Sequence, residues 1–298
     1  MTEPDQLADL VPDVATLADR LGEAGYLADT GLATALFCAV RLPRPIVLEG
    51  EAGVGKTEAA KALAAVLDTP LIRLQCYEGI EAAEALYEWN YPRQLLGIRL
   101  AEAAGEHLEE ADLFGRAYLV SRPLLAAVEH PGPRPAVLLI DEVDRADEQF
   151  EAFLFELLAE SAITIPEIGT IRARLAPLAV LTSNRTRDLH DALKRRCLYH
   201  WIDYPDRDRA AQIVRRRVPQ AGADLTEGVA GAVGRLRSLD LQKPPGIAEA
   251  IDWVGALRLL GVDRLDETAA AATLGSVLKY REDYEVAASR GLDWVARG

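Results

Sequence analysis

The sequence predicts an α/β fold, in which a parallel sheet of five strands carries helices on both faces and a smaller all-helical region follows. Residues 45–67 read as an apolar strand, a glycine-rich loop and a helix rich in alanine and leucine. Two further apolar runs, 136–140 and 178–182, lack the polar alternation of half-exposed strands, which is typical of strands buried on both faces. Beyond Pro205 only helical patterns follow, so we expect the sheet to end there.

The most informative stretch is Gly50–Thr57, which matches the pattern G-x-x-x-x-G-K-[ST] between a strand and a helix. Glycines let the backbone N–H groups turn inward, and the helix N-terminus adds its positive dipole, so a polyphosphate can bind there. We expect Lys56 to reach the β- and γ-phosphates and the Thr57 hydroxyl to hold Mg²⁺. The alternative is a simple glycine turn. The predicted binding residues are Gly50, Glu51, Ala52, Gly53, Val54, Gly55, Lys56, Thr57 and Glu58.

Two acidic residues, Asp141 and Glu142, follow the apolar run 136–140. In open α/β sheets ligands bind at the carboxyl ends of the strands, which is where this pair would lie. We expect Asp141 to hold Mg²⁺ directly or through water, and Glu142 to polarise the attacking water. Alone they could equally be two solvated acids at a strand end, but the glycine-rich loop favours the functional interpretation.

Three more polar residues are candidates for the same site. Asn184 ends the second apolar run, where its amide could orient water or the γ-phosphate, although a lone asparagine is more often a turn residue. Arg195 and Arg196 close a predicted helix that begins at Asp191. Either one of them reaches the γ-phosphate of a neighbouring subunit and stabilises charge in the transition state, or both form a solvated basic face.

Two segments interrupt the alternation of strands and helices. Trp89 and Tyr91 lie in a stretch that predicts a turn or short hairpin, followed by a helix over residues 95–110. Its aromatic side chains either cover the core or grip a substrate. Residues 162–173 predict a β-hairpin that turns near residues 167–169.

The composition argues against several classes of protein. The chain has 298 residues, 50% of them apolar and 27% charged, which indicates a globular protein of two domains. Its net charge of −14 argues against nucleic acid as the main partner. The cysteines and histidines show no metal or disulfide spacing, which fits a reducing cytoplasm. We expect no signal peptide and no membrane span, because the acidic start lacks a basic region and no apolar run approaches ~20 residues.

The order of these motifs resembles that of the AAA+ ATPases, which combine a nucleotide-binding P-loop domain with a helical lid. The hairpin before the Asn184 strand and the chain length resemble the MoxR branch. The resemblance covers about residues 25–290. Several stretches are similar to MoxR proteins encoded with carbon monoxide dehydrogenase, a molybdenum hydroxylase, which are maturation chaperones: Glu49–Glu58, Gln75–Gly79, Trp89–Arg93, Lys243–Gly246 and Asp252-Trp253.

The resemblance implies ATP and Mg²⁺ as ligands, a hexameric ring, a partner with a von Willebrand factor A domain and a metalloenzyme client. Residues 1–204, including helices within 1–40, would form the nucleotide-binding domain, and residues 205–298 the lid. The implied roles are Walker A for Gly50–Thr57, Walker B for Asp141 and Glu142, sensor 1 for Asn184, and the arginine finger for Arg195 or Arg196.

The lid departs from the family pattern. MoxR proteins usually carry an arginine in a Ser-Pro-Arg context at the start of a lid helix, where this chain has Lys243-Pro244-Pro245-Gly246. A lysine lacks the bidentate fork of arginine, so Lys243 either replaces it imperfectly or is a loop residue.

The sequence therefore favours an ATPase that remodels a client protein. A nucleotide-dependent switch or scaffold with little turnover is the second possibility, and the missing lid arginine favours it slightly. A DNA-dependent motor is a weaker third, because the chain is acidic and shows no basic stripe.

Overall fold

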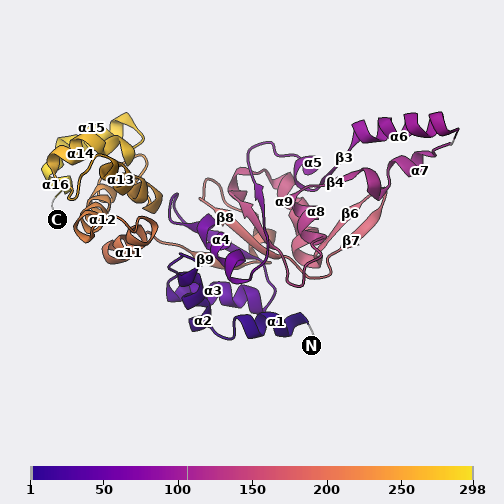
Figure 1. The fold of residues 1–298 in the computed structure, drawn as a ribbon, viewed down its shortest axis with the longest axis horizontal. Coiled ribbons are helices and arrows are strands. Elements are labelled where there is room, and N and C mark those ends of the chain that lie inside the picture. The colour runs from indigo at the N-terminus through magenta and orange to yellow at the C-terminus, as the bar shows by residue number, and fades with distance from the viewer. Residues whose placement is uncertain (1–2, 106, 297–298) are drawn as a thin grey trace. The chain divides into compact units, whose positions relative to one another are not determined.

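The structure, a computed structural model, describes residues 3–105 and 107–296 (Figure 1). It consists of two compact units, each formed from separate stretches of the chain. The sheet unit comprises the chain up to Ala24 together with Ala28–Glu49 and Ala59–His200. The loop–lid unit comprises Gly25–Leu27, Gly50–Glu58 and the chain from Trp201. The glycine-rich loop therefore belongs to the same unit as the C-terminal helices.

The sheet unit is built on five strands, as the sequence predicts. They are β1 (Ile46–Glu49), β2 (Leu71–Gln75), β5 (Val137–Asp141), β8 (Leu178–Ser183) and β9 (Leu198–Trp201). Their order across the sheet is β2–β5–β8–β1–β9, and the pairs β2–β5, β5–β8 and β8–β1 are parallel. Parallel neighbours need crossover connections, which the helices and insertions between the strands provide.

The pairing register brings the carboxyl ends of four strands to one edge of the sheet. Gln75 lies opposite Asp141, and Glu49 lies opposite Ser183. Every residue of β1, β5 and β8 is buried, which explains why their sequences are unbroken apolar runs. Polar residues begin only where these strands end, so the polar edge of the sheet is the place where a ligand can meet it.

Helices pack around this sheet (Figure 1). Phe150 and Leu154 of α9 share a core with Leu138 and Ile140 of β5. Side-chain caps start several of the helices; for example, Asp147 accepts a hydrogen bond from the Phe150 amide at the start of α9. The helices before and around the sheet are α1 (Glu3–Leu10), α2 (Val14–Glu23), α3 (Thr30–Arg41), α4 (Lys56–Val66), α8 (Pro123–Val128), α9 (Glu148–Glu160) and α10 (Asp191–Lys194).

The segment between β2 and β5 forms an excursion of its own, in which β3 (Tyr87–Trp89) and β4 (Leu119–Ser121) pair antiparallel and α6 (Tyr91–Ala104) projects (Figure 1). The sequence predicts a helix over residues 95–110, but α6 starts earlier, because Asn90 caps it and Pro92 fits its first turn. It ends at Gly105, which has φ +73°. Short helices flank it: α5 (Ala82–Ala85), α7 (Glu110–Leu113) and η1 (Arg116–Tyr118).

Three leucines of α6 are exposed to solvent. Leu95, Leu96 and Leu100 are 61%, 57% and 62% exposed. On the other side of the excursion, Trp89 packs edge-on against Phe114, with ring centroids 5.2 Å apart. Trp89, one of the aromatic residues predicted to cover the core or grip a substrate, thus has an intramolecular partner, whereas the three leucines are mostly exposed.

A β-hairpin follows α9, as the sequence predicts, and consists of β6 (Ala162–Ile165) and β7 (Gly169–Arg172). The hydroxyl groups of Thr164 and Thr170 lie 2.9 Å apart across the pair. Its inner side joins the core through Ile163 and Ile165. The hairpin is therefore anchored to the sheet unit along one face.

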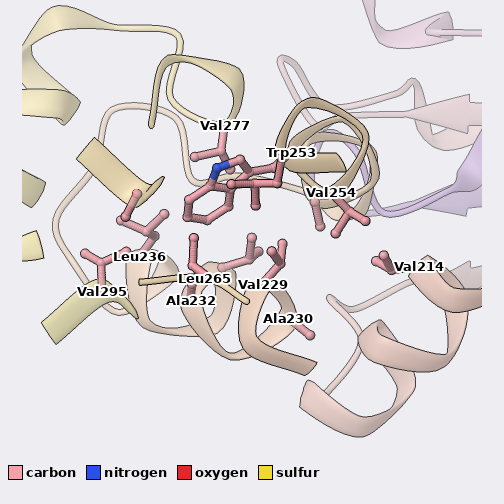
Figure 2. Packing of buried hydrophobic residues seen from close by; sticks show 14 of the residues in the cluster. Val214, Val229, Ala230, Ala232, Leu236, Trp253, Val254, Leu265, Val277 and Val295 are labelled. Atoms are coloured by element: carbon pink, nitrogen blue, oxygen red, sulfur yellow. The ribbon is translucent and has the colours of Figure 1, made fainter. Parts of the chain in front are cut away.

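The C-terminal part of the loop–lid unit is helical in the residues that the structure describes, around a core centred on Trp253 (Figure 2). The indole N–H of Trp253 donates to Thr273 Oγ1 at 2.7 Å, which satisfies the one polar group of a fully buried ring. No helix in residues 3–105 and 107–296 is long and apolar enough to cross a membrane. The elements are α11 (Arg207–Arg217), α12 (Ala223–Arg237), α13 (Ile247–Leu259), α14 (Glu267–Thr273), η3 (Leu274–Ser276), α15 (Arg281–Arg290) and α16 (Leu292–Ala296).

Candidate functional site

Two glycines of the loop occupy positions where other residues would not fit. Gly53 has φ +78°, a left-handed backbone that side chains disfavour, and a Cβ on it would lie 3.0 Å from Cα of Gly246. A Cβ on Gly50 would lie 2.4 Å from the carbonyl oxygen of Ile202. Helix α4 starts directly after the loop at Lys56, so the positive end of the helix dipole lies at the loop. The loop and helix start thus offer the N–H groups and dipole that bind an anion.

Lys56 is folded back onto this loop. Its side chain is buried, and Nζ donates to the carbonyl oxygens of Gly50 at 2.8 Å and Glu51 at 2.7 Å. A lysine that spans the loop in this way keeps the ammonium group inside the curve of the backbone. A bound polyphosphate would offer this group stronger, charged acceptors than the two carbonyls.

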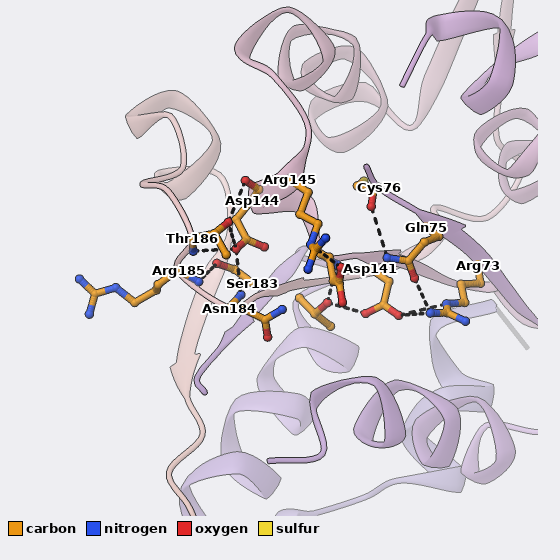
Figure 3. Close-up of polar contacts among 12 residues, drawn as sticks. Arg73, Gln75, Cys76, Asp141, Asp144, Arg145, Ser183, Asn184, Arg185 and Thr186 are labelled. Carbon is orange, nitrogen blue, oxygen red and sulfur yellow. Dashed lines mark hydrogen bonds and ion pairs between the residues drawn. The ribbon is translucent and has the colours of Figure 1, made fainter. Parts of the chain in front are cut away.

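Asp141 is buried at the polar edge of the sheet, and side chains from two strands bind its carboxylate. It is 3% exposed, and Oδ1 accepts a hydrogen bond from the Thr182 hydroxyl at 2.6 Å. Oδ2 accepts from Nε and Nη2 of Arg73, at 3.0 and 2.6 Å, as Figure 3 shows. Neighbouring strands β2 and β8 therefore fix both oxygens of the carboxylate.

Glu142 has a left-handed backbone, with φ +56° and ψ +48°. A residue with a side chain pays for this conformation in strain, and such outliers cluster at functional sites. Its amide donates to Thr182 Oγ1 at 2.9 Å, and its carboxylate pairs with Arg145 Nε at 2.7 Å. The backbone of Glu142 and the carboxylate of Asp141 thus share one hydroxyl group as their support.

Asn184 follows β8 at the same edge and is supported by Asp144 (Figure 3). The Asn184 amide donates to Asp144 Oδ2 at 3.2 Å, and the amide and hydroxyl of Thr186 donate to the same oxygen at 2.9 and 2.7 Å. Asp144 is 2% exposed, and within the described residues its other oxygen has no hydrogen-bond partner. A buried acid that fixes a loop by three donors was not evident from the sequence, where Asp144 is one of several acids in a row.

The two candidate arginines differ in their surroundings. Arg196 lies with Cζ 5.1 Å from the centre of the Phe155 ring, and its Nη1 donates to the Ala192 carbonyl at 2.9 Å. Arg195 is exposed, and its guanidinium has no hydrogen bond or ion pair with any residue that the structure describes. Arg44 donates to the main-chain carbonyls of both residues, at 3.4 and 3.1 Å. Arg44 thus fixes the main chain of both arginines. Of their two side chains, only that of Arg195 remains available to contact another subunit.

The edge of the sheet has a strongly acidic environment. Burial, and after it the charges of Asp141, Asp144 and Glu142, raises the pKa of the Cys76 thiol to about 12. Cys76 also donates its amide to the Asp141 carbonyl at 2.8 Å. The carboxylates of Asp141, Asp144 and Glu142 all contribute to this rise, so negative charge gathers at this edge of the sheet.

Glu49, the last residue of β1, is a buried acid that sequence reasoning missed. It accepts a hydrogen bond from the Tyr199 hydroxyl at 2.8 Å and lies 3.4 Å from Ser183 Oγ. Burial and this hydrogen bond raise the pKa of Tyr199 to about 12. Since the loop begins at the next residue, these bonds fix the point from which it leaves the sheet.

In the lid, Lys243 stands where the MoxR pattern has an arginine. Its side chain is exposed, and its amide donates to Asp283 Oδ2 at 3.2 Å. The nearby arginine with a defined position is Arg237, whose Nε donates to the Pro245 carbonyl at 2.6 Å and whose Cζ lies 4.1 Å from the centre of the Tyr204 ring. Burial lowers the pKa of Arg237.

The donors at the sheet edge fit a magnesium ion better than a transition metal. In the described part of the chain, no group of three or more histidine, cysteine or acidic residues could hold a metal alone. Mg²⁺ prefers oxygen ligands, keeps several waters and uses one or two carboxylates together with phosphate oxygens. The Asp141 carboxylate, with the Thr182 hydroxyl group beside it, offers oxygen ligands of that kind.

Comparison with known families decides what this arrangement is. Residues 45–197, which are 153 of the 298, match the family model described as "AAA domain (dynein-related subfamily)". The chain belongs to this AAA family. It is therefore a P-loop ATPase that binds ATP and hydrolyses it, as the glycine loop and the acidic strand end predict.

The relatives of this AAA protein match much of its sequence but are themselves uncharacterised, so they indicate no function beyond that of the family. An uncharacterised protein of Staphylococcus aureus (strain USA300) is 24% identical over 234 residues, which are 75% of this chain and 81% of the relative. Another, from strain NCTC 8325, is 25% identical over 182 residues, 59% of this chain and 62% of the relative. The second match thus spans less than two thirds of that protein's length.

Among solved structures, a single-residue variant of RuvB from Thermotoga maritima is similar to this chain at 18% identity and a TM-score of 0.48. The match covers 82% of this chain and 67% of that one. The RuvB Holliday junction branch migration motor itself gives 15% identity, a TM-score of 0.46 and coverages of 90% and 68%. At that overlap the similarity carries no argument about activity.

Proposed function

We propose that this AAA ATPase is a MoxR-type chaperone, which uses ATP hydrolysis to remodel a client protein during metalloenzyme maturation or cofactor insertion. The observation that carries the ATPase part is the buried Asp141, fixed by Thr182 and followed by the strained Glu142. The chaperone part rests on the similarity of Gln75–Gly79 and Trp89–Arg93 to MoxR sequences.

The binding step uses the loop and the sheet edge. Lys56 exchanges the carbonyls of Gly50 and Glu51 for oxygens of the β- and γ-phosphates, while the loop amides and the start of α4 take the remaining charge. Thr57 and Asp141 would hold Mg²⁺, which neutralises phosphate charge when bound.

The hydrolytic step uses the two polar residues that follow the strands. Glu142 takes a proton from the attacking water, for which its carboxylate has to leave Arg145. The Asn184 side chain orients that water, on a backbone held by Asp144. An arginine from the next subunit stabilises the negative charge that develops on the γ-phosphoryl group in the transition state. Arg195 is the better candidate, because the guanidinium of Arg196 is held by Phe155 and the Ala192 carbonyl.

Such a site is completed only in an assembly, so we propose a hexameric ring in which each subunit supplies an arginine to its neighbour. Residues 1–204 would form the nucleotide-binding domain and residues 205–298 the lid. Within the loop–lid unit, the Ile247 amide donates to the Gly53 carbonyl at 3.0 Å. A change in the loop on hydrolysis thus acts directly on the first turn of α13.

The client would meet the excursion and the hairpin of the sheet unit. A cavity of about 890 Å³ lies there, lined by Trp89, Tyr91 and the half-exposed Phe153 together with Glu88 and Glu156. Aromatic walls with a few polar groups are typical of binding pockets. A von Willebrand factor A domain partner and a cytoplasmic location complete the proposal; three free cysteines agree with a reducing compartment.

The test is hydrolysis by the full chain with and without its partner protein. The Glu142→Gln variant is expected to bind ATP normally and to lose activity by roughly 10²–10⁴-fold, because it lacks the proton acceptor. An unchanged rate would remove Glu142 from the mechanism. Client remodelling is tested separately, by the yield of metal-loaded client in cells that carry only this variant.

A second candidate, a nucleotide-dependent switch with little turnover, is favoured by one observation, the exposed Lys243 where relatives in the MoxR branch carry an arginine. It predicts that the wild-type chain binds ATP but that its steady-state rate stays near that of Glu142→Gln even with the partner present. The ATPase proposal predicts a clear difference between the two.

A further inference from the structure

We infer that Arg73 competes with the divalent cation for Asp141: its guanidinium holds the carboxylate before the metal–nucleotide complex arrives and has to leave when the cation enters. This rests on the proposed role of Asp141 in holding Mg²⁺. It adds a residue that no motif of the sequence singled out and that sits on a different strand.

The contact is a fork on one oxygen (Figure 3). Nε and Nη2 of Arg73 lie 3.0 and 2.6 Å from the same atom, Oδ2 of Asp141. Nη2 also donates to Oε1 of Gln75, which stands opposite Asp141 in the β2–β5 register. Arg73 thus reaches along the strand from a position opposite Leu139, guided by the glutamine beside it.

The competition follows from the capacity of the carboxylate. Each oxygen offers two lone pairs; the two guanidinium N–H groups occupy both of those on Oδ2, and the Thr182 hydroxyl occupies one on Oδ1. A magnesium ion needs an oxygen at about 2.0–2.1 Å, or a lone pair that accepts from one of its waters. Neither is compatible with an arginine fork on the same atom, and two cations at one carboxylate repel each other.

The location of Arg73 allows it to leave. β2 is an edge strand of the sheet, and the Arg73 side chain is 49% exposed whereas that of Asp141 is 4% exposed. The guanidinium can therefore swing to solvent without opening the core. Asp141 keeps its hydrogen bond from the Thr182 hydroxyl, so its carboxylate stays in position when Arg73 leaves.

The competing explanation is that Arg73 only positions Asp141. The two explanations predict opposite changes in cation affinity. Removing a competitor tightens cation binding, whereas removing a positioning group weakens it. The experiment therefore measures cation affinity rather than activity alone. Mn²⁺ replaces Mg²⁺ as a paramagnetic probe, and its binding to the full-length chain with saturating ADP is followed by electron paramagnetic resonance.

The Arg73→Met variant keeps the length of the side chain and removes the charge. It is expected to bind Mn²⁺ roughly tenfold more tightly, as loss of a charge-assisted fork implies. Arg73→Lys keeps a charge without the fork and is expected to fall between the two. Gln75→Leu leaves Arg73 in place but loosens it, so a smaller tightening is expected. The matched control is Arg172→Met, which breaks an exposed ion pair with Glu160 on the same unit and should leave the affinity unchanged.

Equal or weaker Mn²⁺ binding by both Arg73→Met and Gln75→Leu overturns the inference and assigns Arg73 a positioning role. If Arg73→Met does not fold, Arg73→Lys and Gln75→Leu decide instead: tighter Mn²⁺ binding than in the wild-type chain supports the inference, and equal or weaker binding overturns it. Failure of the wild-type chain to take up nucleotide at all, with Lys56→Ala behaving identically, instead sinks the proposed function and the inference with it. The two failures are therefore distinguishable in one set of titrations.

Discussion

The amide of Ile247, the first residue of α13, donates a 3.0 Å hydrogen bond to the carbonyl oxygen of Gly53 in the phosphate-binding loop. The contact is tight on both sides, because a Cβ on Gly246 would lie 2.7 Å from Cα of Gly53. Helix α13 therefore starts directly on the loop, with no room for a side chain between them. This contact gives the first prediction.

Gly246→Ala is expected to push α13 off the loop. The clash is with backbone, which cannot move aside cheaply, so a loss of about 1–3 kcal/mol in the free energy of unfolding is expected, together with weaker ATP binding. Gly255→Ala, in the same helix, is the control: its Cβ would meet open space, and it should gain up to ~1 kcal/mol from helix propensity. Urea unfolding and titration with a fluorescent ATP analogue measure both. Equal behaviour of the two variants would mean that the contact has no energetic weight.

Arg195→Ala is expected to lower kcat by roughly 10³-fold while leaving the affinity for ATP unchanged, because the charge acts on a neighbour's transition state. Arg196→Ala should have a smaller effect, since its guanidinium is held by Phe155 and the Ala192 carbonyl. Mixing Arg195→Ala subunits with wild-type subunits should lower the rate out of proportion to their share. The reverse ranking of the two variants would assign the role to Arg196.

Trp253 and Thr273 form the one hydrogen bond of the buried indole in the lid core. Trp253→Ala is expected to cost about 3–5 kcal/mol, as a large cavity opens. Thr273→Val should cost about 1–3 kcal/mol by leaving the indole N–H without a partner, but much less in a Trp253→Phe background. Denaturant unfolding of the four variants gives the coupling energy between the two residues, and a coupling energy of zero would contradict this hydrogen bond.

Cys76 gives a pH dependence with a definite sign. Its ordinary pKa is 9.0 and burial raises it to about 12 in the folded chain. Below pH 9 both folded and unfolded thiols are protonated and the contribution is constant. Between pH 9 and 12 the unfolded thiol ionises first, so stability falls as pH rises. Relative to Cys76→Ala, the wild-type chain should lose stability across this range, by an amount of order 1 kcal/mol per pH unit. A parallel pH profile for both proteins would show that the thiol is not buried among acids.

The parts of the fold that the sequence predicts well are those governed by local pattern. The runs of β5 and β8 are apolar throughout because both faces are covered, and the glycines of the loop are required by backbone geometry at Gly53. The hairpin of β6 and β7 also follows from alternation and turn residues. These features depend on neighbours in the chain, so the chain reveals them.

The excursion between β2 and β5 is predicted less well. The stretch Asn90-Tyr91-Pro92-Arg93 reads as a turn, although asparagine followed by proline two residues later is also how a helix begins. Asn90 directly follows β3, whose antiparallel pairing with β4 joins residues some thirty positions apart. Local pattern cannot supply that pairing.

Side-chain partners from other strands are the part of the site that the sequence cannot reveal. Arg73 and Thr182 meet Asp141 because of the strand order and register, and neither stands near it in the chain. The left-handed backbone of Glu142 is equally invisible, since glutamate gives no hint of it. A motif can be read from the sequence, whereas the groups that hold its residues in place cannot.

The outward leucines of α6 have a practical consequence. Leu95, Leu96 and Leu100 are exposed apolar side chains on a projecting helix. The net charge of −14 makes molecules of the protein repel one another at low ionic strength. Added salt screens that repulsion but does not weaken hydrophobic association between the exposed leucines. Solutions of the isolated protein should therefore turn cloudy as ionic strength rises, and replacing Leu96 and Leu100 by glutamine should keep them clear.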